Sequence, residues 1–343
     1  MKHLLNSLFI TTNNIYLSLD GENVVASQER QELARYPLHT LQHIISFAYA
    51  GASPALMGEC AKRGIVLSFC TPNGRFLART IGKTNGNVLL RRKQYRTADD
   101  ESESCIIAKN MIIGKLYNCE WVLKRALRDH PDRVDQEKIR GAIEILKEQI
   151  NLSKQTTTLD SLRGFEGVGA AAYFSCFDQM ILRNKDDFFF DERNRRPPLD
   201  NVNAMLSFGY TLLAHECAGA LESVGLDSYV GFMHRDRPGR ESLALDMMEE
   251  LRPLMVDRMV LSVINNRVIA PGDFSKEEGG AIRFTDGGRR LFLKTWQERK
   301  QEMLVHPFLN EKIKWGLVPY VQALLLSRLL RGDLDGYPAF LWK

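Results

Sequence analysis

The feature that most constrains the fold is a change of hydrophobic periodicity near residue 87. Before it, short apolar runs separated by turn residues, a pattern typical of strands, fall at residues 8–12, 15–19, 31–36, 44–47 and 65–69. Asp20-Gly21 just ahead of Val24-Val25 predicts a tight hairpin. Beyond residue 87, apolar residues recur every three or four positions, as on one face of a helix. A block of strands followed by a block of helices, without βαβ alternation, predicts an α+β fold.

The same patterns predict the individual helices and the domain boundary. A short helix is expected over residues 53–63, with Ser53 as its cap and Gly64 after its end. The acidic stretch 99–103 predicts a break, and longer helices are expected at residues 105–130, 132–153, 158–179, 201–226, 242–263, 291–304 and 315–331. One hydrophobic core rarely organises more than about 250–300 residues. The 343 residues therefore predict a small β-rich domain over 1–86 and a larger all-helical domain over 87–343.

Charge is distributed unevenly between these two parts. Residues 1–96 hold 12 Lys and Arg against 5 Asp and Glu, whereas the remainder holds 34 against 37. A basic amino-terminal part suits a polyanionic partner such as nucleic acid. The alternative is an ordinary solvated basic face.

The cysteines and the apolar runs exclude several classes of protein. Six cysteines are scattered singly without a C-x-x-C pair, so a zinc ribbon or thioredoxin-type motif is not expected, and reduced, buried thiols are. No signal peptide or apolar anchor is visible, which predicts a cytoplasmic protein without a membrane association. The absence of a P-loop and of a G-x-G-x-x-G motif argues against ATP and NAD.

The first candidate for chemistry is Glu166, which stands alone in the glycine- and alanine-rich stretch 162–174. Small residues there would let another element approach closely. A buried carboxylate needs a cation, a hydrogen-bond donor or a metal. The alternative is an exposed glutamate near the start of a helix, where the helix dipole favours a negative charge.

The second candidate is the arginine-rich stretch 191–203, in which Arg195 and Arg196 directly precede Pro197-Pro198. Guanidinium groups suit phosphate oxygens. The alternative is a solvated loop whose arginines pair with Asp191 and Glu192.

The third candidate combines His234 with the helical stretch 242–253. Asp246 and Glu249 are three residues apart and therefore share a helix face. Together with His234 and a distant glutamate they could form a metal site of carboxylate oxygens and imidazole nitrogen. The alternative is that the two carboxylates pair with Arg252 or its neighbours.

Taken together, the three stretches resemble a known family, the CRISPR-associated integrase of spacer acquisition, which is the endonuclease-type subunit of the adaptation complex. The matching motifs are G-F-E-G-x-x-A-A-x-Y-F at 164–174, R-R-P-P-x-D-x-x-N-x-x-L-S at 195–207, G-x-x-H at 231–234 and S-L-A-L-D-x-M-E-E-x-R-P at 242–253. The order of the motifs and the expected layout of a β domain before a helical domain also match along nearly the whole chain.

The resemblance implies a metal-dependent DNA endonuclease and integrase of antiviral defence, which inserts short foreign fragments into a CRISPR array. It places the ligands of Mn²⁺ or Mg²⁺ at Glu166, His234 and Glu249, and it puts Asp246 beside them or near DNA. The reaction would be transesterification by a 3′-hydroxyl, which needs no Ser, Tyr or Cys nucleophile because no covalent enzyme intermediate forms. A divalent cation can align the reacting oxygens. The implied partners are double-stranded DNA, a small ferredoxin-like second adaptation protein and a second copy of this chain, paired through residues 1–86.

Further residues follow from the same resemblance. Arg195 and Arg196 would hold the DNA backbone, and Asn203 or Tyr210 could orient a phosphate or a ligand. Arg289 and Arg290 would begin a second DNA face, for which the alternative is a solvated helix. Two other functions use the same residues: a structure-specific nuclease on branched DNA, with water as the nucleophile, or a catalytically silent DNA-binding scaffold.

Overall fold

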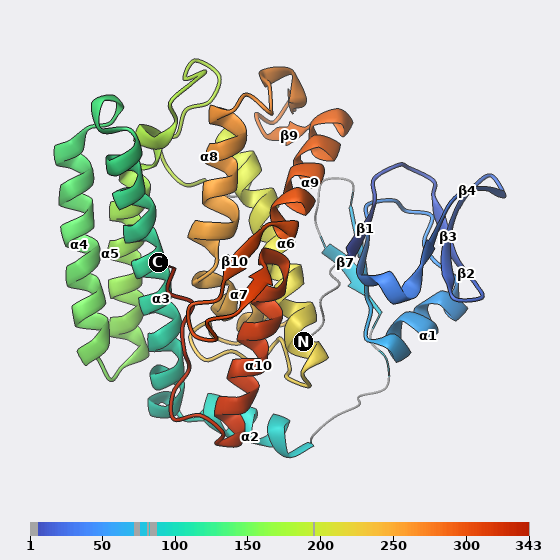
Figure 1. The fold of residues 1–343 in the computed structure, drawn as a ribbon, viewed down its shortest axis with the longest axis horizontal. Coiled ribbons are helices and arrows are strands. Elements are labelled where there is room, and N and C mark those ends of the chain that lie inside the picture. The colour runs from blue at the N-terminus through green and yellow to red at the C-terminus, as the bar shows by residue number, and fades with distance from the viewer. Residues whose placement is uncertain (1–5, 72–75, 81, 83–87, 195, 343) are drawn as a thin grey trace. The chain divides into compact units, whose positions relative to one another are not determined.

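The computed structural model describes residues 6–71, 76–80, 82, 88–194 and 196–342 (Figure 1). The chain divides into two compact units, Met1–Gly86 with Asp286–Glu302, and Asn87–Thr285 with Met303–Lys343. The division falls between residues 86 and 87, but the first unit also takes a late segment that the sequence analysis kept within 87–343. Hydrophobic periodicity identifies a helix, not the unit with which it packs.

The first unit contains two small sheets. Strands β1 (Asn6–Ile10), β5 (Leu41–Ser46), β6 (Val66–Cys70) and β7 (Phe76–Arg79) form one sheet in this order, and β2 (Tyr16–Asp20), β3 (Asn23–Gln28) and β4 (Gln31–Pro37) form the other. Asp20 pairs with Asn23 across the expected tight hairpin. Residues from both sheets share one core, which includes the fully buried side chains of Leu17, Ile44 and Leu67.

Helix α1 (Pro54–Arg63) confirms the predicted short helix and its two ends. The Ser53 hydroxyl accepts a hydrogen bond from the Leu56 N–H, and Gly64 ends the helix in the left-handed conformation. The sequence did not predict what α1 connects. Strands β5 and β6 are parallel, so β5, α1 and β6 form one βαβ unit inside the β-rich part.

The second unit is mostly helical, which confirms the α+β class. Helices α3 (Glu101–Asp129), α4 (Gln136–Gln155) and α5 (Leu159–Ser175) lie side by side in Figure 1 and pack on one another. Asp100 separates α2 (Val88–Asp99) from α3 and accepts hydrogen bonds from the N–H groups of Ser102 and Glu103 at 2.8 and 3.1 Å. The expected break at 99–103 is therefore a single capping residue. Helices α6 (Asn201–Ser223) and α10 (Val318–Arg331) also pack together.

Two features of the second unit differ from expectation. The stretch 242–263 is not one helix but α7 (Ser242–Glu249), a π-helical segment over Pro253–Asp257 and α8 (Arg258–Asn265). Pro253 has no N–H to continue the α-helical ladder, which explains the interruption. The unit also contains two short hairpins, β8 (Phe274–Lys276) with β9 (Ile282–Phe284) and β10 (Met303–Val305) with β11 (Lys312–Lys314), so it is not all-helical.

Two of the exclusions made from the sequence can be compared with the structure. All six cysteines are buried and free, which agrees with the expectation of buried thiols. Within the described ranges, none of the helices has the length and apolar character needed to cross a membrane.

Candidate metal and DNA site

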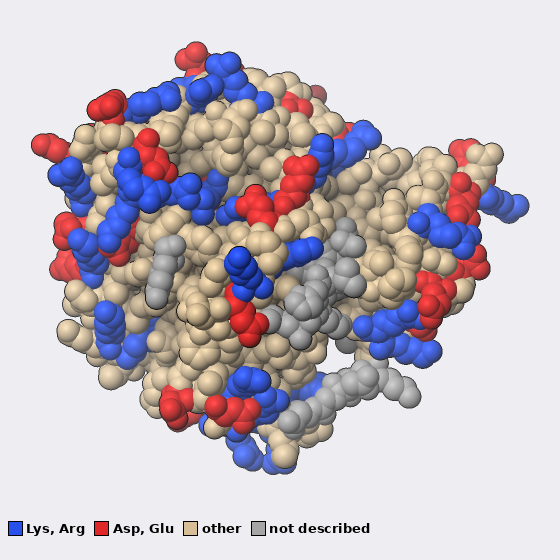
Figure 2. All heavy atoms as spheres, in the orientation of Figure 1, with Lys and Arg blue, Asp and Glu red and all other residues tan. Residues whose placement is uncertain are grey.

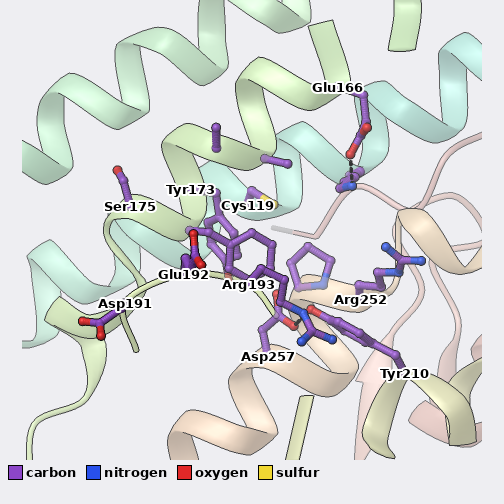
Figure 3. Close-up of a pocket in the computed structure, with 15 residues that line it drawn as sticks. Cys119, Glu166, Tyr173, Ser175, Asp191, Glu192, Arg193, Tyr210, Arg252 and Asp257 are labelled. Atoms are coloured by element: carbon purple, nitrogen blue, oxygen red, sulfur yellow. Dashed lines mark hydrogen bonds and ion pairs between the residues drawn. The ribbon is translucent and has the colours of Figure 1, made fainter. Parts of the chain in front are cut away.

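Three helices of the second unit bring Glu166 and Glu249 to the same cation. Glu166 lies midway along α5, Glu249 ends α7, and Lys115 lies between them on α3. The Lys115 Nζ forms an ion pair with Glu166 Oε1, drawn as a dashed line in Figure 3, and is 2.7 Å from Glu249 Oε2. Gly169 permits the close approach of α5 to α3, because a Cβ at this position would overlap the side chain of Leu116. Gly169 thus has the role that the sequence suggested for the small residues, whereas a Cβ on Gly164 or Gly167 would meet nothing within 4 Å.

Electrostatics keep Glu249 and Lys115 charged although both are buried. Burial alone would raise the pKa of the Glu249 carboxyl, but chiefly Arg252 and Lys115 lower it to about 2. Arg252 contributes through an ion pair of 3.0 Å with the second oxygen, Oε1. Burial also works against the charge on Lys115, yet Glu249 and Glu166 raise its pKa. Glu249 and Lys115 are therefore an ion pair in the folded protein.

Asp246 fixes the position of His234. One carboxylate oxygen accepts the N–H groups of Phe232 and Met233 at 2.6 and 2.9 Å, and the other lies 3.0 Å from the His234 N–H and 2.6 Å from its Nδ1. Because the carboxylate is an acceptor, the proton lies on Nδ1, and Nε2 is left as the nitrogen that could bind a ligand. Asp246 therefore orients His234, which is one of the two roles expected for it.

Gly231 allows this arrangement to be compact. A Cβ on Gly231 would lie 2.8 Å from Asp246 Oδ2 and 2.9 Å from the Ser242 side chain. The glycine of the G-x-x-H motif is thus explained by the close packing of the loop against the start of α7.

Whether these residues suit a metal can be judged from their atoms. No group of three or more His, Cys, Asp or Glu side chains in the described part of the chain is gathered closely enough to hold a metal ion. Instead, the Lys115 ammonium is shared by Glu166 and Glu249. Glu249 Oε2 is buried and makes no well-directed hydrogen bond, although Lys115 Nζ lies close to it. Carboxylate oxygens and an imidazole nitrogen are donor types that suit a divalent cation, but in this structure it is the Lys115 ammonium that lies between Glu166 and Glu249.

A pocket of about 410 Å³ opens beside Glu166. Tyr210 lies between the guanidinium groups of Arg193 and Arg252, which are 5.4 and 5.0 Å from the centre of its ring, and its hydroxyl donates to Asp257 at 2.6 Å (Figure 3). Burial raises the pKa of Asp257 to about 6. The pocket combines aromatic walls and cationic groups with the carboxyl groups of Glu166, Asp191, Glu192 and Asp257. Its aromatic and cationic parts would suit part of a nucleotide.

Asn203 stabilises a loop, whereas the sequence predicted that it could orient a phosphate or a ligand. Its side chain is buried, donates to the Glu192 carbonyl at 2.8 Å and accepts from Arg193 at 2.6 Å. It therefore holds the loop that carries Arg193 in place, and Tyr210, not Asn203, lines the pocket.

The four arginines predicted to bind DNA differ in where they lie and in whether they are exposed. Arg195 lies outside the described residues, and Arg196 is on an exposed loop. Arg289, on α9 (Asp286–Gln301), is buried and paired with Asp286 at 2.8 Å, so its proposed place on a DNA face is wrong; Arg290 is exposed. A basic sequence pattern does not reveal which face of a helix is buried. Figure 2 shows Lys and Arg interspersed with Asp and Glu on the face drawn, so charge alone does not mark a path for DNA there.

Sequence reasoning missed a second set of residues behind the site. Glu250, next to Glu249, is fully buried and accepts hydrogen bonds from Tyr337 Oη at 2.5 Å and from the Phe340 N–H at 2.7 Å. Asn118 on α3 donates to the carbonyls of Glu250 and Phe340, each at 2.7 Å. The segment near the end of the described chain is thereby fixed to the end of α7. The signal for Lys115 was present: it lies four residues after Met111 and four before Cys119, on the buried stripe of α3.

Comparison with known proteins gives a consistent result. The family model described as CRISPR associated protein Cas1 matches residues 8–298. A curated protein of Chlorobaculum tepidum, CRISPR-associated endonuclease Cas1 1, is 48% identical over 343 residues, covering 100% of both chains. Among solved structures, a casposase bound to integration product has a TM-score of 0.83 at 23% identity, covering 99% of this chain and 94% of that one. A chain of a Cas6-RT-Cas1–Cas2 complex has a TM-score of 0.80 at 23% identity, covering 100% of this chain and 36% of the other. The two structural likenesses show the fold.

Proposed function

This chain belongs to the CRISPR-associated protein Cas1 family, and from this premise we propose that it is a metal-dependent DNA endonuclease and integrase that inserts short DNA fragments into a CRISPR array. The observation that carries the proposal is the meeting of Glu166 and Glu249, from separate helices, on a shared cation, together with the fixed orientation that Asp246 gives to His234. The presence of two glutamates and a histidine, the residue types that a divalent cation needs, argues against a catalytically silent scaffold.

Glu166, His234 through Nε2, and Glu249 would hold the divalent cation, Mn²⁺ or Mg²⁺. When bound, the cation would supply charge neutralisation at the phosphate and alignment of the attacking and leaving oxygens. Asp246 keeps the imidazole in the required orientation, and Arg252 keeps Glu249 ionised. Both contacts, Asp246 with His234 and Arg252 with Glu249, are present in the structure.

In the proposed reaction, the 3′-hydroxyl of an incoming fragment attacks a phosphodiester of the repeat. One O–P bond forms, the bond to the leaving 3′-oxygen breaks, and the attacking hydroxyl loses the proton that the leaving oxygen gains. The exchange conserves the number of phosphodiester bonds, so it needs no external energy source. Arg193 and Arg252 line the pocket beside Glu166 and would balance the charge of a phosphate there.

The proposed partners follow from the family and from the names of its members. The solved casposase is named as bound to an integration product, and the Cas6-RT-Cas1 chain as part of a complex with Cas2. For this chain we accordingly propose binding of double-stranded DNA, a small ferredoxin-like second adaptation protein and a homodimer formed through the β-rich part.

The name of the C. tepidum relative, an endonuclease, favours a second candidate, a nuclease on branched DNA with water as the nucleophile. Both reactions use the same residues, but their products differ. A strand-transfer assay separates them, with labelled fragments, supercoiled DNA carrying a repeat, and the second adaptation protein present or absent. Integration predicts label joined to the repeat, whereas nicked DNA without joined label would support hydrolysis instead.

A further inference from the structure

Lys115 is a buried cation at the centre of the proposed metal site. Only 8% of its side chain is exposed, and its Nζ contacts one oxygen of Glu166 and one of Glu249. Lysine is rarely buried without a charged partner. The two glutamates come from α5 and α7, so this ammonium is also a link between two helices through the third, α3.

The contacts of this ammonium overlap with those that a divalent cation would need. Metal–oxygen distances are about 2.0–2.6 Å, and Lys115 Nζ lies 2.7 Å from Glu249 Oε2. A cation bound to the same two oxygens would occupy nearly the same space as the ammonium. Like charges at such a separation repel strongly in a buried site, so the two cations exclude each other.

Resting on the proposed function, we infer that Lys115 is a built-in competitor for the divalent cation. Its ammonium holds Glu166 and Glu249 together when the metal is absent, and it leaves both carboxylates when the metal binds. Lys115 is thus a positioning residue that lowers metal affinity and compensates the negative charge of Glu166 and, together with Arg252, that of Glu249.

The pocket beside Glu166 could receive the displaced Lys115 ammonium. Lys115 and Glu166 both line the 410 Å³ pocket, so rotation of the flexible lysine side chain can carry Nζ into it without movement of α3. In that pocket a DNA phosphate would offer the oxygen acceptors that the carboxylates no longer provide.

Titration calorimetry with MnCl₂, without DNA, tests the inference on the full chain. Lys115→Met removes the ammonium and keeps an unbranched apolar side chain. Lys124→Met is the matched control, because Lys124 lies on the same helix but is exposed and pairs with Glu120. Lys115→Met should bind Mn²⁺ more tightly by on the order of tenfold, a usual size for coupled binding, and Lys124→Met should bind as wild type does.

Thermal unfolding provides a second readout and also checks folding. Without metal, Lys115→Met should unfold at a lower temperature than wild type, because Glu166 and Glu249 lose their shared cation. Mn²⁺ should then raise its unfolding temperature by more than it raises that of the wild type. If Lys115→Met does not fold, Lys115→Gln, which is neutral but can still donate a hydrogen bond to a carboxylate, replaces it in both measurements.

The outcomes distinguish this inference from the proposed function. Equal or weaker Mn²⁺ binding in the Lys115 variant, together with lost binding in Glu166→Gln, would overturn the competition and leave the metal site standing. If neither wild type nor any variant binds Mn²⁺, the metal site and the competition are both wrong.

Discussion

Replacing Asp246 by asparagine tests how the site is held in place. The two oxygens of this fully buried carboxylate serve four donors: Oδ2 accepts the N–H groups of Phe232 and Met233, and Oδ1 faces the N–H and Nδ1 of His234. An amide keeps one oxygen and replaces the other with NH₂. If the amide NH₂ faces His234, the imidazole can move its proton to Nε2 and accept at Nδ1, so at least one backbone donor, the His234 N–H, is left facing a donor. Leaving a buried donor unsatisfied costs about 1–3 kcal/mol, so the variant should lose about 1–3 kcal/mol of unfolding free energy.

The same change should weaken Mn²⁺ binding. Loss of a partner that orients a metal-binding histidine typically reduces metal affinity by about 10–100-fold. Urea unfolding followed by circular dichroism measures the first effect, and calorimetric titration with MnCl₂ measures the second. Asp236→Asn is the matched control, because Asp236 lies on the exposed loop between His234 and α7. If Asp246→Asn unfolds at the same urea concentration as the control and binds Mn²⁺ equally well, Asp246 does not hold the site together.

Three other properties can be predicted together. Burial raises the pKa of Glu250 from 4.5 to about 7, so between these pH values the folded chain keeps a proton that the unfolded chain has lost. The free energy of unfolding should therefore fall as pH rises from about 4.5 to 7. Urea unfolding at pH 5 and pH 8 should show a smaller difference in this free energy for Glu250→Gln than for wild type. Light scattering at micromolar concentration should report about twice 39.1 kDa, and a persistent monomer would refute the proposed dimer. The double variant Arg195→Ala with Arg196→Ala should reduce DNA affinity, and the slope of log affinity against log salt should flatten by about 0.9 for each lost phosphate contact. Removal of Arg91 to Lys93 should affect strand joining less. An unchanged slope in the double variant would show that the two arginines do not bind phosphate.

Local patterns in the sequence predict the elements because the forces that set them are local. The caps at Ser53 and Asp100 act within one helical turn, and apolar spacing reports which face of each helix is buried. The interruption of the stretch 242–263 also had a local signal in Pro253. Parallel pairing of β5 with β6 had none, because the register between strands depends on partners that are distant in sequence.

In the functional site, too, some residues could be predicted from the sequence and others could not. The motifs locate Glu166, His234 and Glu249, because a resemblance compares whole patterns of residues. Lys115 was missed, since its partners lie 51 residues away at Glu166 and still further at Glu249. The contacts of Glu250 with residues near 340 are equally long-range. Such pairings depend on how helices meet, which no single stretch of sequence contains.

The central claim is that Glu166, His234 and Glu249 act together in joining DNA, and His234→Ala tests it most directly. The measurement is strand transfer of a labelled fragment into supercoiled repeat-containing DNA, with the second adaptation protein, in Mn²⁺ and separately in Mg²⁺. Circular dichroism should show a folded variant. We predict no joined product from His234→Ala in either metal, and the same loss from Glu166→Ala and Glu249→Ala. Joining by His234→Ala at the wild-type rate in either metal would contradict the account.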